Sequence, residues 1–168
     1  GPCAAIAALA VSGLFTAKFV FEGFLSTATG ERRESLERLK SETRTILLYE
    51  APHKLKTTLA DLEKALGDRK ISLCRELTKL NEEILRTTLS EAVTYYENTA
   101  PRGEYVLVIE GASEKEAKEA AFWADMTERE HVSYYTDRGM TKSDAIKQTA
   151  RDRGDGKSEI YNIVMKKD

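Results

Sequence analysis

Cysteine and histidine are scarce in this sequence, which has two of each among 168 residues. Cys3 and Cys74 are too few for the disulfide framework of a small secreted domain. Together with His53 and His131 they cannot supply the four ligands of a structural zinc site. We therefore expect no bound metal, and we expect both cysteines to be free, buried thiols.

Long apolar runs and a large excess of one charge are also missing. No stretch approaches the roughly 20 apolar residues of a membrane span, and no basic segment precedes the apolar residues 3–11, as it would in a signal peptide. The formal net charge of -2 excludes a generally basic nucleic-acid binder, although not a local basic face. We expect a cytoplasmic protein without a membrane span.

Three common catalytic signatures do not occur either. Gly13, Gly23 and Gly30 do not fit a dinucleotide-binding fingerprint, and no Gly-rich loop could cradle a phosphate. A nucleophile elbow is absent as well. Any chemistry must therefore come from other charged loops.

The stretch 43–55 organises the chain. Residues 46–49 form a short apolar run that is typical of a strand buried on both faces. Pro52 suits the first turn of a helix, and leucines recur at helical spacing from 55 to 66. Ligands in open α/β sheets lie at such strand ends, although this turn could also be an ordinary charged loop. Its charged or titratable residues are Glu50, His53 and Lys54.

Strand-like and helix-like segments alternate up to about residue 112, which is typical of a layered α/β domain. The expected strands are 18–25, 43–49, 70–77, 83–88 and 104–110. The expected helices are 2–13, 31–42, 52–66 and 90–98, with Ser90 as the N-cap of the last. Because no helix separates the two strands around residue 80, part of the sheet should be antiparallel. The sequence predicts an α/β domain over residues 1–112, with a mixed β-sheet flanked by helices.

The character of the chain changes after residue 112. Residues 114–124 and 127–138 predict two helices, Thr141 with Asp144 starts a third, and residues 160–165 mark a last one. We expect residues 113–168 to form a small helical C-terminal appendage. Residues 138–167 hold eight Lys/Arg and four Asp/Glu, a net charge of +4. Two helices joined by a Gly-containing turn resemble a helix-turn-helix, but an ordinary helical packing module has the same pattern.

Five segments occur in one order and spacing. They are Gly-Pro-Cys-Ala-Ala at 1–5, Phe-Glu-Gly-Phe-Leu at 21–25, Tyr-Glu-Ala-Pro-His-Lys-Leu at 49–55, Arg-Glu-Leu-Thr-Lys-Leu-Asn-Glu-Glu at 75–83 and Pro-Arg-Gly-Glu-Tyr-Val-Leu-Val-Ile-Glu-Gly at 101–111. This set closely resembles the small-subunit rRNA methyltransferase I family of the tetrapyrrole methylase superfamily. The resemblance covers essentially the whole chain and implies the C-terminal half of a tetrapyrrole methylase fold.

The chain departs from this family at its start. It begins at Gly1, and Gly1-Pro2-Cys3-Ala4 corresponds to the family's Pro-Gly-Pro-Ser-Ala, with Cys3 in place of the serine. The N-terminal half of these proteins, with its Gly/Pro-rich cofactor loop and Asp-Ala-Gly-Thr-Pro segment, has no counterpart. We therefore expect a C-terminal portion that carries one wall of the cofactor site, binds the cofactor weakly and does not methylate alone.

The resemblance implies transfer of a methyl group from S-adenosylmethionine to the ribose 2'-hydroxyl of a cytidine in small-subunit (16S) rRNA. Such a displacement needs no metal, only alignment of the hydroxyl and removal of its proton. The sequence does not choose among the candidate bases, which are His53, Glu76 and Lys79, and a base in the N-terminal half of the family's fold stays a further alternative. The residues implied around the cofactor are Leu48, Tyr49, Glu50, Arg75, Glu76, Leu77, Gly103 and Glu104. As ordinary surface residues, Glu50 and Glu76 would instead pair with Lys54 or Arg75.

Basic residues could contact RNA phosphates. The candidates are Arg32, Arg33, Lys142, Lys147, Arg151 and Lys157. Most charges between 31 and 42 should instead pair with one another at helical spacing. An exposed half-interface should also drive formation of a homodimer. Two other functions stay open: a tetrapyrrole or corrin methyltransferase of the same superfamily, and a non-catalytic RNA-binding module.

Overall fold

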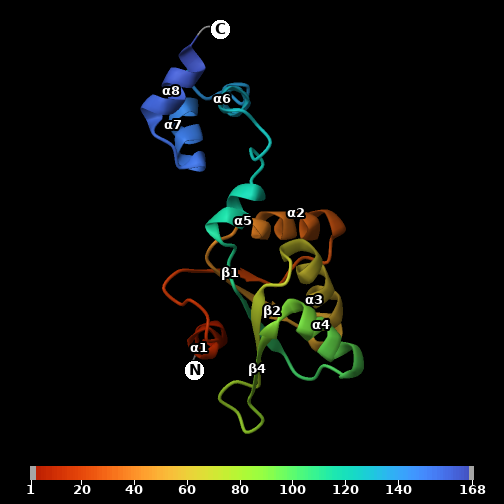
Figure 1. Ribbon diagram of the computed structural model, residues 1–168. Coiled ribbons are helices and arrows are strands. Elements are labelled where there is room, and N and C mark those ends of the chain that lie inside the picture. Colours follow the sequence, from red (N-terminus) through yellow and green to blue (C-terminus); the bar gives the residue numbers. More distant parts are fainter. Residues whose placement is uncertain (1–2, 167–168) are drawn as a thin grey trace. The chain divides into compact units, whose positions relative to one another are not determined.

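The computed structural model describes residues 3–166, and the chain divides into two compact units, Gly1–Ala117 and Lys118–Asp168 (Figure 1). We call them the α/β unit and the helical unit. The expected first helical residue, Pro2, lies outside the described residues together with Gly1.

The α/β unit contains a five-stranded mixed sheet with the strand order β1-β2-β5-β3-β4. β1 pairs with β2 in parallel, and the other three pairings are antiparallel. The prediction of a mixed sheet is therefore confirmed. The strands are β1 (Phe19–Gly23), β2 (Thr45–Glu50), β3 (Lys70–Arg75), β4 (Glu83–Thr88) and β5 (Tyr105–Ile109).

Side chains alternate between the two faces of the sheet, and the two faces are covered differently. Leu48 and Leu107 point into a large core shared with α2 (Thr29–Lys40), α3 (Pro52–Leu66) and α4 (Leu89–Asn98). Leu47 and Val108 point the other way, into a smaller core against α1 (Ala4–Val11). Figure 1 shows α3 and α4 on the side of the sheet opposite α1.

Two sequence expectations in this unit are wrong. Ser90 does not cap α4, because the helix already begins at Leu89; the cap is Thr88, whose side chain accepts from the N–H of Glu91. Ser90 lies in the first turn, where its N–H donates to the carboxylate of Asp68. Cys3 is not a buried thiol, since it is exposed, whereas Cys74 is fully buried.

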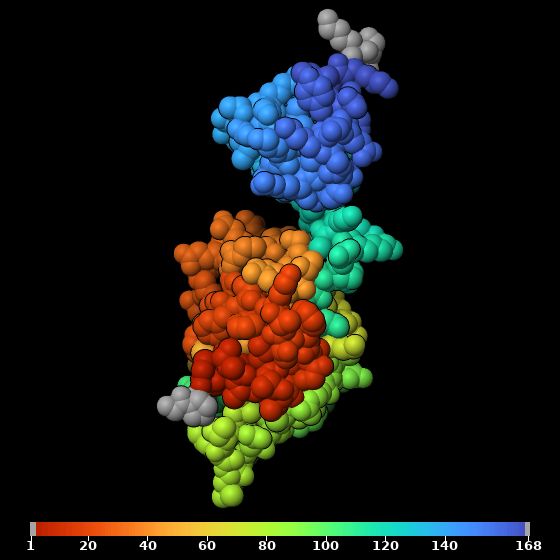
Figure 2. All heavy atoms as spheres, turned by 90° about the vertical axis from the view of Figure 1, so that its left-hand side faces the viewer, coloured from red at the N-terminus to blue at the C-terminus, as the bar shows by residue number. Residues whose placement is uncertain are grey.

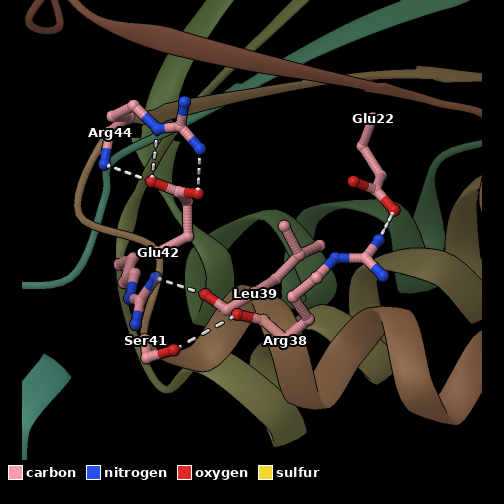
Figure 3. Close-up of polar contacts among 7 residues, drawn as sticks. Glu22, Arg38, Leu39, Ser41, Glu42 and Arg44 are labelled. Carbon is pink, nitrogen blue, oxygen red and sulfur yellow. Dashed lines mark hydrogen bonds and ion pairs between the residues drawn. The ribbon is translucent and has the colours of Figure 1, made fainter. Parts of the chain in front are cut away.

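The turn between α2 and β2 is fixed by arginines (Figure 3). Arg44 donates from its backbone N–H and its guanidinium to the carboxylate of Glu42, and these bonds lower the pKa of Glu42. Arg69, almost fully buried, donates to the last carbonyls of α2, those of Leu39 and Lys40. Such donors satisfy carbonyls that a helix end leaves unpaired.

Gly111 lies against the same turn. A Cβ on it would stand 2.2 Å from the carbonyl oxygen of Thr43. Only glycine therefore fits where β5 passes the start of β2.

The helical unit is built from α6 (Glu128–Thr136), α7 (Lys142–Arg153) and α8 (Lys157–Met165), which pack on one another. α5 (Glu114–Glu119) is shorter than the helix expected over 114–124, because the chain turns repeatedly between Lys118 and Met126. Thr141 caps α7 as expected, and Gly154, in a left-handed conformation, ends it. Among the described residues, no helix combines the length and apolar character that crossing a membrane requires.

Candidate functional site

The sheet topology brings four chain segments to one edge. β1, β2 and β3 run in the same direction, and β5 runs against them. The ends of β1, β2 and β3 therefore meet the start of β5. Tyr105 at the start of β5 pairs with Glu50 of β2 on one side and with Arg75 of β3 on the other.

A pocket of about 300 Å³ opens at this edge. It is bounded by the residue that begins α1, the loop after β1, the ends of β2 and β3, and the start of β5. Its lining residues are Ala4, Phe24, Tyr49, Glu50, Cys74, Arg75, Glu76, Leu77, Lys79, Glu104, Tyr105 and Val106. Glu50, Glu76 and Glu104, which the resemblance implied around the cofactor, thus line one cavity.

Glu50 is a buried carboxylate, only 3% exposed. One oxygen accepts from the Thr58 hydroxyl at 2.6 Å and the other from the backbone N–H of Ala51 at 2.8 Å. Its hydrogen-bond partners are therefore α3 and the turn before it, rather than Lys54. These two hydrogen bonds fix the orientation of the Glu50 side chain in the pocket lining.

Glu76 forms the opposite wall with unusual backbone geometry. Its φ is 49° and that of Thr78 is 64°, left-handed values that cost non-glycine residues about 1–3 kcal/mol each. The carboxylate of Glu76 pairs with Lys79 at 3.0 Å rather than with Arg75. Gly103, at φ 69°, leaves room for the Glu76 side chain, because a Cβ on Gly103 would stand 3.2 Å from Oε1 of Glu76.

Arg75 and Tyr105 also line a second cavity of about 360 Å³, together with residues at the end of α4. Its guanidinium pairs with Glu83, and that bond raises the pKa of Arg75. Tyr96, beside Tyr105 in this second cavity, has its pKa raised chiefly by burial. Burial likewise raises the pKa of the Cys74 thiol in the first pocket, so the thiol there is a neutral wall rather than a nucleophile.

Three residues expected at the site do not line the pocket. The side chain of Leu48 is buried in the core against α3. Gly103 lies next to Glu76, which lines the pocket in its place. His53 is exposed in the first turn of α3. Of the three candidate bases, Glu76 and Lys79 face the cavity and His53 does not.

Several other residues of the pocket lining had no recognisable pattern in the sequence. Phe24 packs near Tyr49, with ring centroids 5.7 Å apart, and 64% of its surface is exposed. Cys74, Tyr105 and Val106 flank residues that were singled out, but only the pairing of β5 with β2 and β3 shows that they face the cavity. Tyr105 and Val106 are neighbours on β5 and point to opposite faces of the sheet, so the alternation of strand side chains would not have identified both.

The candidate RNA contacts fall into two groups, one in each unit. In α2, Arg32 donates to Asp61 at 2.8 Å and to Thr58 at 3.0 Å, so its guanidinium is engaged with α3, whereas Arg33 is exposed. The others are exposed in the helical unit: Lys142, Lys147, Arg151 and Lys157. Within residues 3–166, no cluster of His, Cys, Asp or Glu is arranged to hold a metal ion.

Comparison with known proteins identifies relatives of this chain. The family model described as tetrapyrrole (corrin/porphyrin) methylases matches residues 1–93. Ribosomal RNA small subunit methyltransferase I of Halalkalibacterium halodurans is 45% identical over 97% of this chain and 56% of that protein. The protein of the same name in Bacillus subtilis is 43% identical over 96% of this chain and 56% of its own length. The chain thus spans little more than half of these relatives.

Among solved structures, the methyltransferase CobJ superposes on the fold. The TM-score is 0.53 at 18% identity, over 67% of this chain and 49% of CobJ. At this identity the likeness concerns the fold alone.

Proposed function

The chain belongs to the tetrapyrrole (corrin/porphyrin) methylase family, and on that premise we propose that it forms part of a small-subunit rRNA methyltransferase. The proposed reaction moves a methyl group from S-adenosylmethionine to the 2'-hydroxyl of a cytidine ribose in 16S rRNA. The names of the relatives that are 43–45% identical support the rRNA substrate. Such a substrate would locate the reaction in the cytoplasm.

One observation carries the proposal: Glu50, Glu76 and Glu104 come from three separate bends and line a single pocket. S-adenosylmethionine carries a sulfonium and an ammonium group, which carboxylates attract. Pockets for ligands of this size usually measure about 300–1,000 Å³. A pocket of about 300 Å³ lies at the lower end of that range, which suits one wall of a larger site.

The bound donor would supply an activated methyl group, and the chain would have to orient the ribose and accept its proton. Glu76 is the best base among the three candidates, because it lines the pocket and carries lone pairs. Lys79, while charged, can only donate, and its 3.0 Å ion pair would hold the Glu76 carboxylate in position. His53, outside the pocket lining, has no support from the geometry.

The two other functions have weaker support. A corrin methyltransferase would share the fold, but the likeness to CobJ has only 18% identity behind it. A non-catalytic RNA-binding module would not need a buried carboxylate such as Glu50 at the floor of a pocket. The RNA partner itself is supported by the exposed basic residues of the helical unit.

A homodimer is proposed from the face around α1 and β1. Large apolar side chains are exposed there: Ile6, Phe15, Phe19, Phe21 and Phe24. Figure 2 views the α/β unit from the side on which these first residues lie, in red and orange. Exposed apolar surface of this kind favours association.

Nuclear magnetic resonance can test the donor site even if binding is weak. S-adenosylmethionine at millimolar concentration should shift the backbone amides of 49–51, 75–77 and 103–105 and leave those of α6, α7 and α8 unchanged. Calorimetry should detect only weak binding to this chain, and the chain alone should not methylate 16S rRNA. Amide shifts confined to the helical unit would contradict the proposed site. Tight binding of S-adenosylmethionine would contradict the expectation that this chain carries only one wall of the site.

Gly103→Ala supplies a matched variant. Its Cβ would meet Glu76 at 3.2 Å in a left-handed backbone, so binding of the donor should weaken severalfold. Gly67→Ala is the control, because Gly67 has φ 75°, ends α3 and has no neighbour within 4 Å of the added Cβ. Both variants should lose stability, about 1 kcal/mol or more, and Gly67→Ala should lose at least as much as Gly103→Ala, because φ 75° with ψ -168° is a conformation nearly confined to glycine. Only Gly103→Ala should lose binding.

A further inference from the structure

An exposed patch of flat side chains lies in the helical unit, apart from the pocket. It consists of Phe122, Tyr134 and Arg138, and we call it the aromatic–arginine patch. The rings of Phe122 and Tyr134 lie 4.6 Å apart and 34° from parallel. The guanidinium of Arg138 lies over the Tyr134 ring, 3.5 Å from its centroid.

Ring contacts and a hydrogen bond to neighbouring residues hold the patch in place. The Phe122 ring meets the buried His131 ring edge-on at 5.3 Å and the Tyr135 ring at 6.2 Å. Arg138 also donates to the backbone carbonyl of Tyr134 at 3.1 Å, which fixes its guanidinium against the ring. Groups held in place before binding lose little conformational entropy when a ligand arrives.

Phe122 nevertheless keeps 52% of its surface exposed. It lies in the turns between α5 and α6, where no helix periodicity requires an apolar residue. The remaining N–H groups of Arg138 can donate to an anion next to the ring. An open aromatic face beside a stacked guanidinium is the arrangement that binds unpaired bases of RNA.

The charge of the segment that begins at Arg138 favours a nucleic acid over a protein partner. Arg138 opens the segment 138–167, whose net charge is +4. Lys142, Arg151 and Lys157 in this segment are exposed. A phosphate backbone is attracted by these residues, while a base stacks on the ring.

From these contacts we propose that the aromatic–arginine patch binds an unpaired nucleobase of single-stranded RNA, by stacking on Phe122 with Arg138 on the adjoining phosphate. The inference rests on the proposed rRNA substrate and adds a second contact, separate from the methyl-donor pocket. The patch would prefer a loop or an unpaired strand to a duplex, because paired bases cannot expose a face for stacking.

The test compares Phe122→Leu and Phe122→Trp with the unchanged 168-residue chain. Binding of a fluorescein-labelled single-stranded 12-mer, and of the same sequence as a blunt duplex, is measured by anisotropy at several potassium chloride concentrations. Phe122→Leu should weaken single-strand binding about fivefold or more and leave duplex binding unchanged. Phe122→Trp should restore it, because an aromatic ring is again present.

Tyr161→Leu is the matched control, since Tyr161 is an exposed aromatic residue on α8 outside the patch, at 47% exposure. It should bind both RNAs like the parent chain. Lys142→Gln should reduce the salt dependence of binding by about one phosphate contact, whereas Phe122→Leu should leave that dependence unchanged.

The outcomes separate the patch from the proposed function. If the parent chain binds RNA with steep salt dependence and Phe122→Leu binds equally well, the patch proposal is overturned and the RNA partner stands. Equal losses for single strand and duplex also overturn it. If the parent chain binds neither RNA, both the patch and the RNA partner of this chain are rejected.

Discussion

The two units are stabilised in different ways. The α/β unit buries large aliphatic side chains in a core that includes Leu48, Leu59 and Leu107. The helical unit has a smaller apolar core with two alanines in it. That core consists of Val132, Ala145, Ile146, Ala150 and Ile160. Both units bury polar side chains, but the buried histidine, His131, is in the helical unit. The stability contributed by apolar burial does not depend on pH, whereas that of a buried histidine depends on its protonation.

His131 is the centre of a polar group in the helical unit. It is fully buried, stacked on Trp123 at 5.5 Å and on Tyr135 at 5.3 Å. Arg153 donates from Nε to Nδ1 of His131 at 3.2 Å, so Nδ1 must carry a lone pair and the ring must be neutral. Nε2 lies 3.2 Å from Asp152 without making a hydrogen bond.

The largest expected effect breaks the α/β unit alone. Leu107→Ala removes a fully buried side chain from the central strand and should lower the free energy of unfolding by about 2–5 kcal/mol. Circular dichroism in urea would follow the loss. Trp123, the single tryptophan of the chain, reports on the helical unit, and its fluorescence midpoint should not move.

Ile146→Ala is the reciprocal variant in the helical unit. It should shift the fluorescence transition and leave the unfolding of the α/β unit unchanged. If both transitions moved together in either variant, the two units would unfold as one, and the expectation that they unfold independently would be wrong.

Mild acid should separate the units next. Burial is the main cause that lowers the pKa of His131 from its ordinary 6.5. The negative charge of Asp152 opposes this shift, and the positive charge of Arg153 adds to it. Because the unfolded chain binds a proton at His131 more readily than the folded one, stability is complete above pH 6.5 and falls below it. The slope is at most about 1.4 kcal/mol per pH unit for one proton.

The acidic residues act in a lower pH range. In the α/β unit, hydrogen bonds lower the pKa values of Glu42, Asp68 and Glu116 from 4.5 or 3.8, so their contribution is lost only below those values. Glu130 and Asp144 behave likewise in the helical unit. Between pH 6.5 and 5, Trp123 fluorescence should therefore report weakening of the helical unit alone. His131→Gln should remove this pH dependence, and a persistent slope in that variant would assign it to another group.

The smallest effect compares two helix caps. Thr127 caps α6 in a capping box with Glu130, and Thr88 caps α4. Each Thr→Ala change should cost about 1 kcal/mol. The same loss is a larger share of the stability of the smaller unit, so thermal melting should shift more for Thr127→Ala. Ser90→Ala, at the position wrongly expected to cap α4, should change little.

Local patterns predicted most of the fold. The apolar run 46–49 and the leucines after Pro52 predicted β2 and α3, and the missing helix near residue 80 predicted the antiparallel pair. The N-cap of α4 was missed because Thr88 and Ser90 are both good N-cap residues, and the start of the helix at Leu89 decides between them. Ser90 lies inside the first turn, where its N–H donates to Asp68, 22 positions away.

The candidate site was predicted as separate loops rather than as a cavity. Glu76 and Lys79 were recognised by their charge, but His53 was singled out for the same reason and lies outside the pocket lining. Phe24 was overlooked because an aromatic residue in a loop after a strand has no distinctive local pattern. Its position depends on packing near Tyr49.

The sequence by itself determined the order of strands and helices, since propensity, periodicity and capping act over a few residues. It also carried the resemblance to the methylases, because spaced motifs persist along the chain. Only the tertiary structure decided that Glu50, Glu76 and Glu104 share a pocket. It also decided that Phe122 and Arg138 both contact the ring of Tyr134. The reason is physical: strand pairing and helix packing bring together residues that are tens of positions apart, and no local pattern encodes those distances.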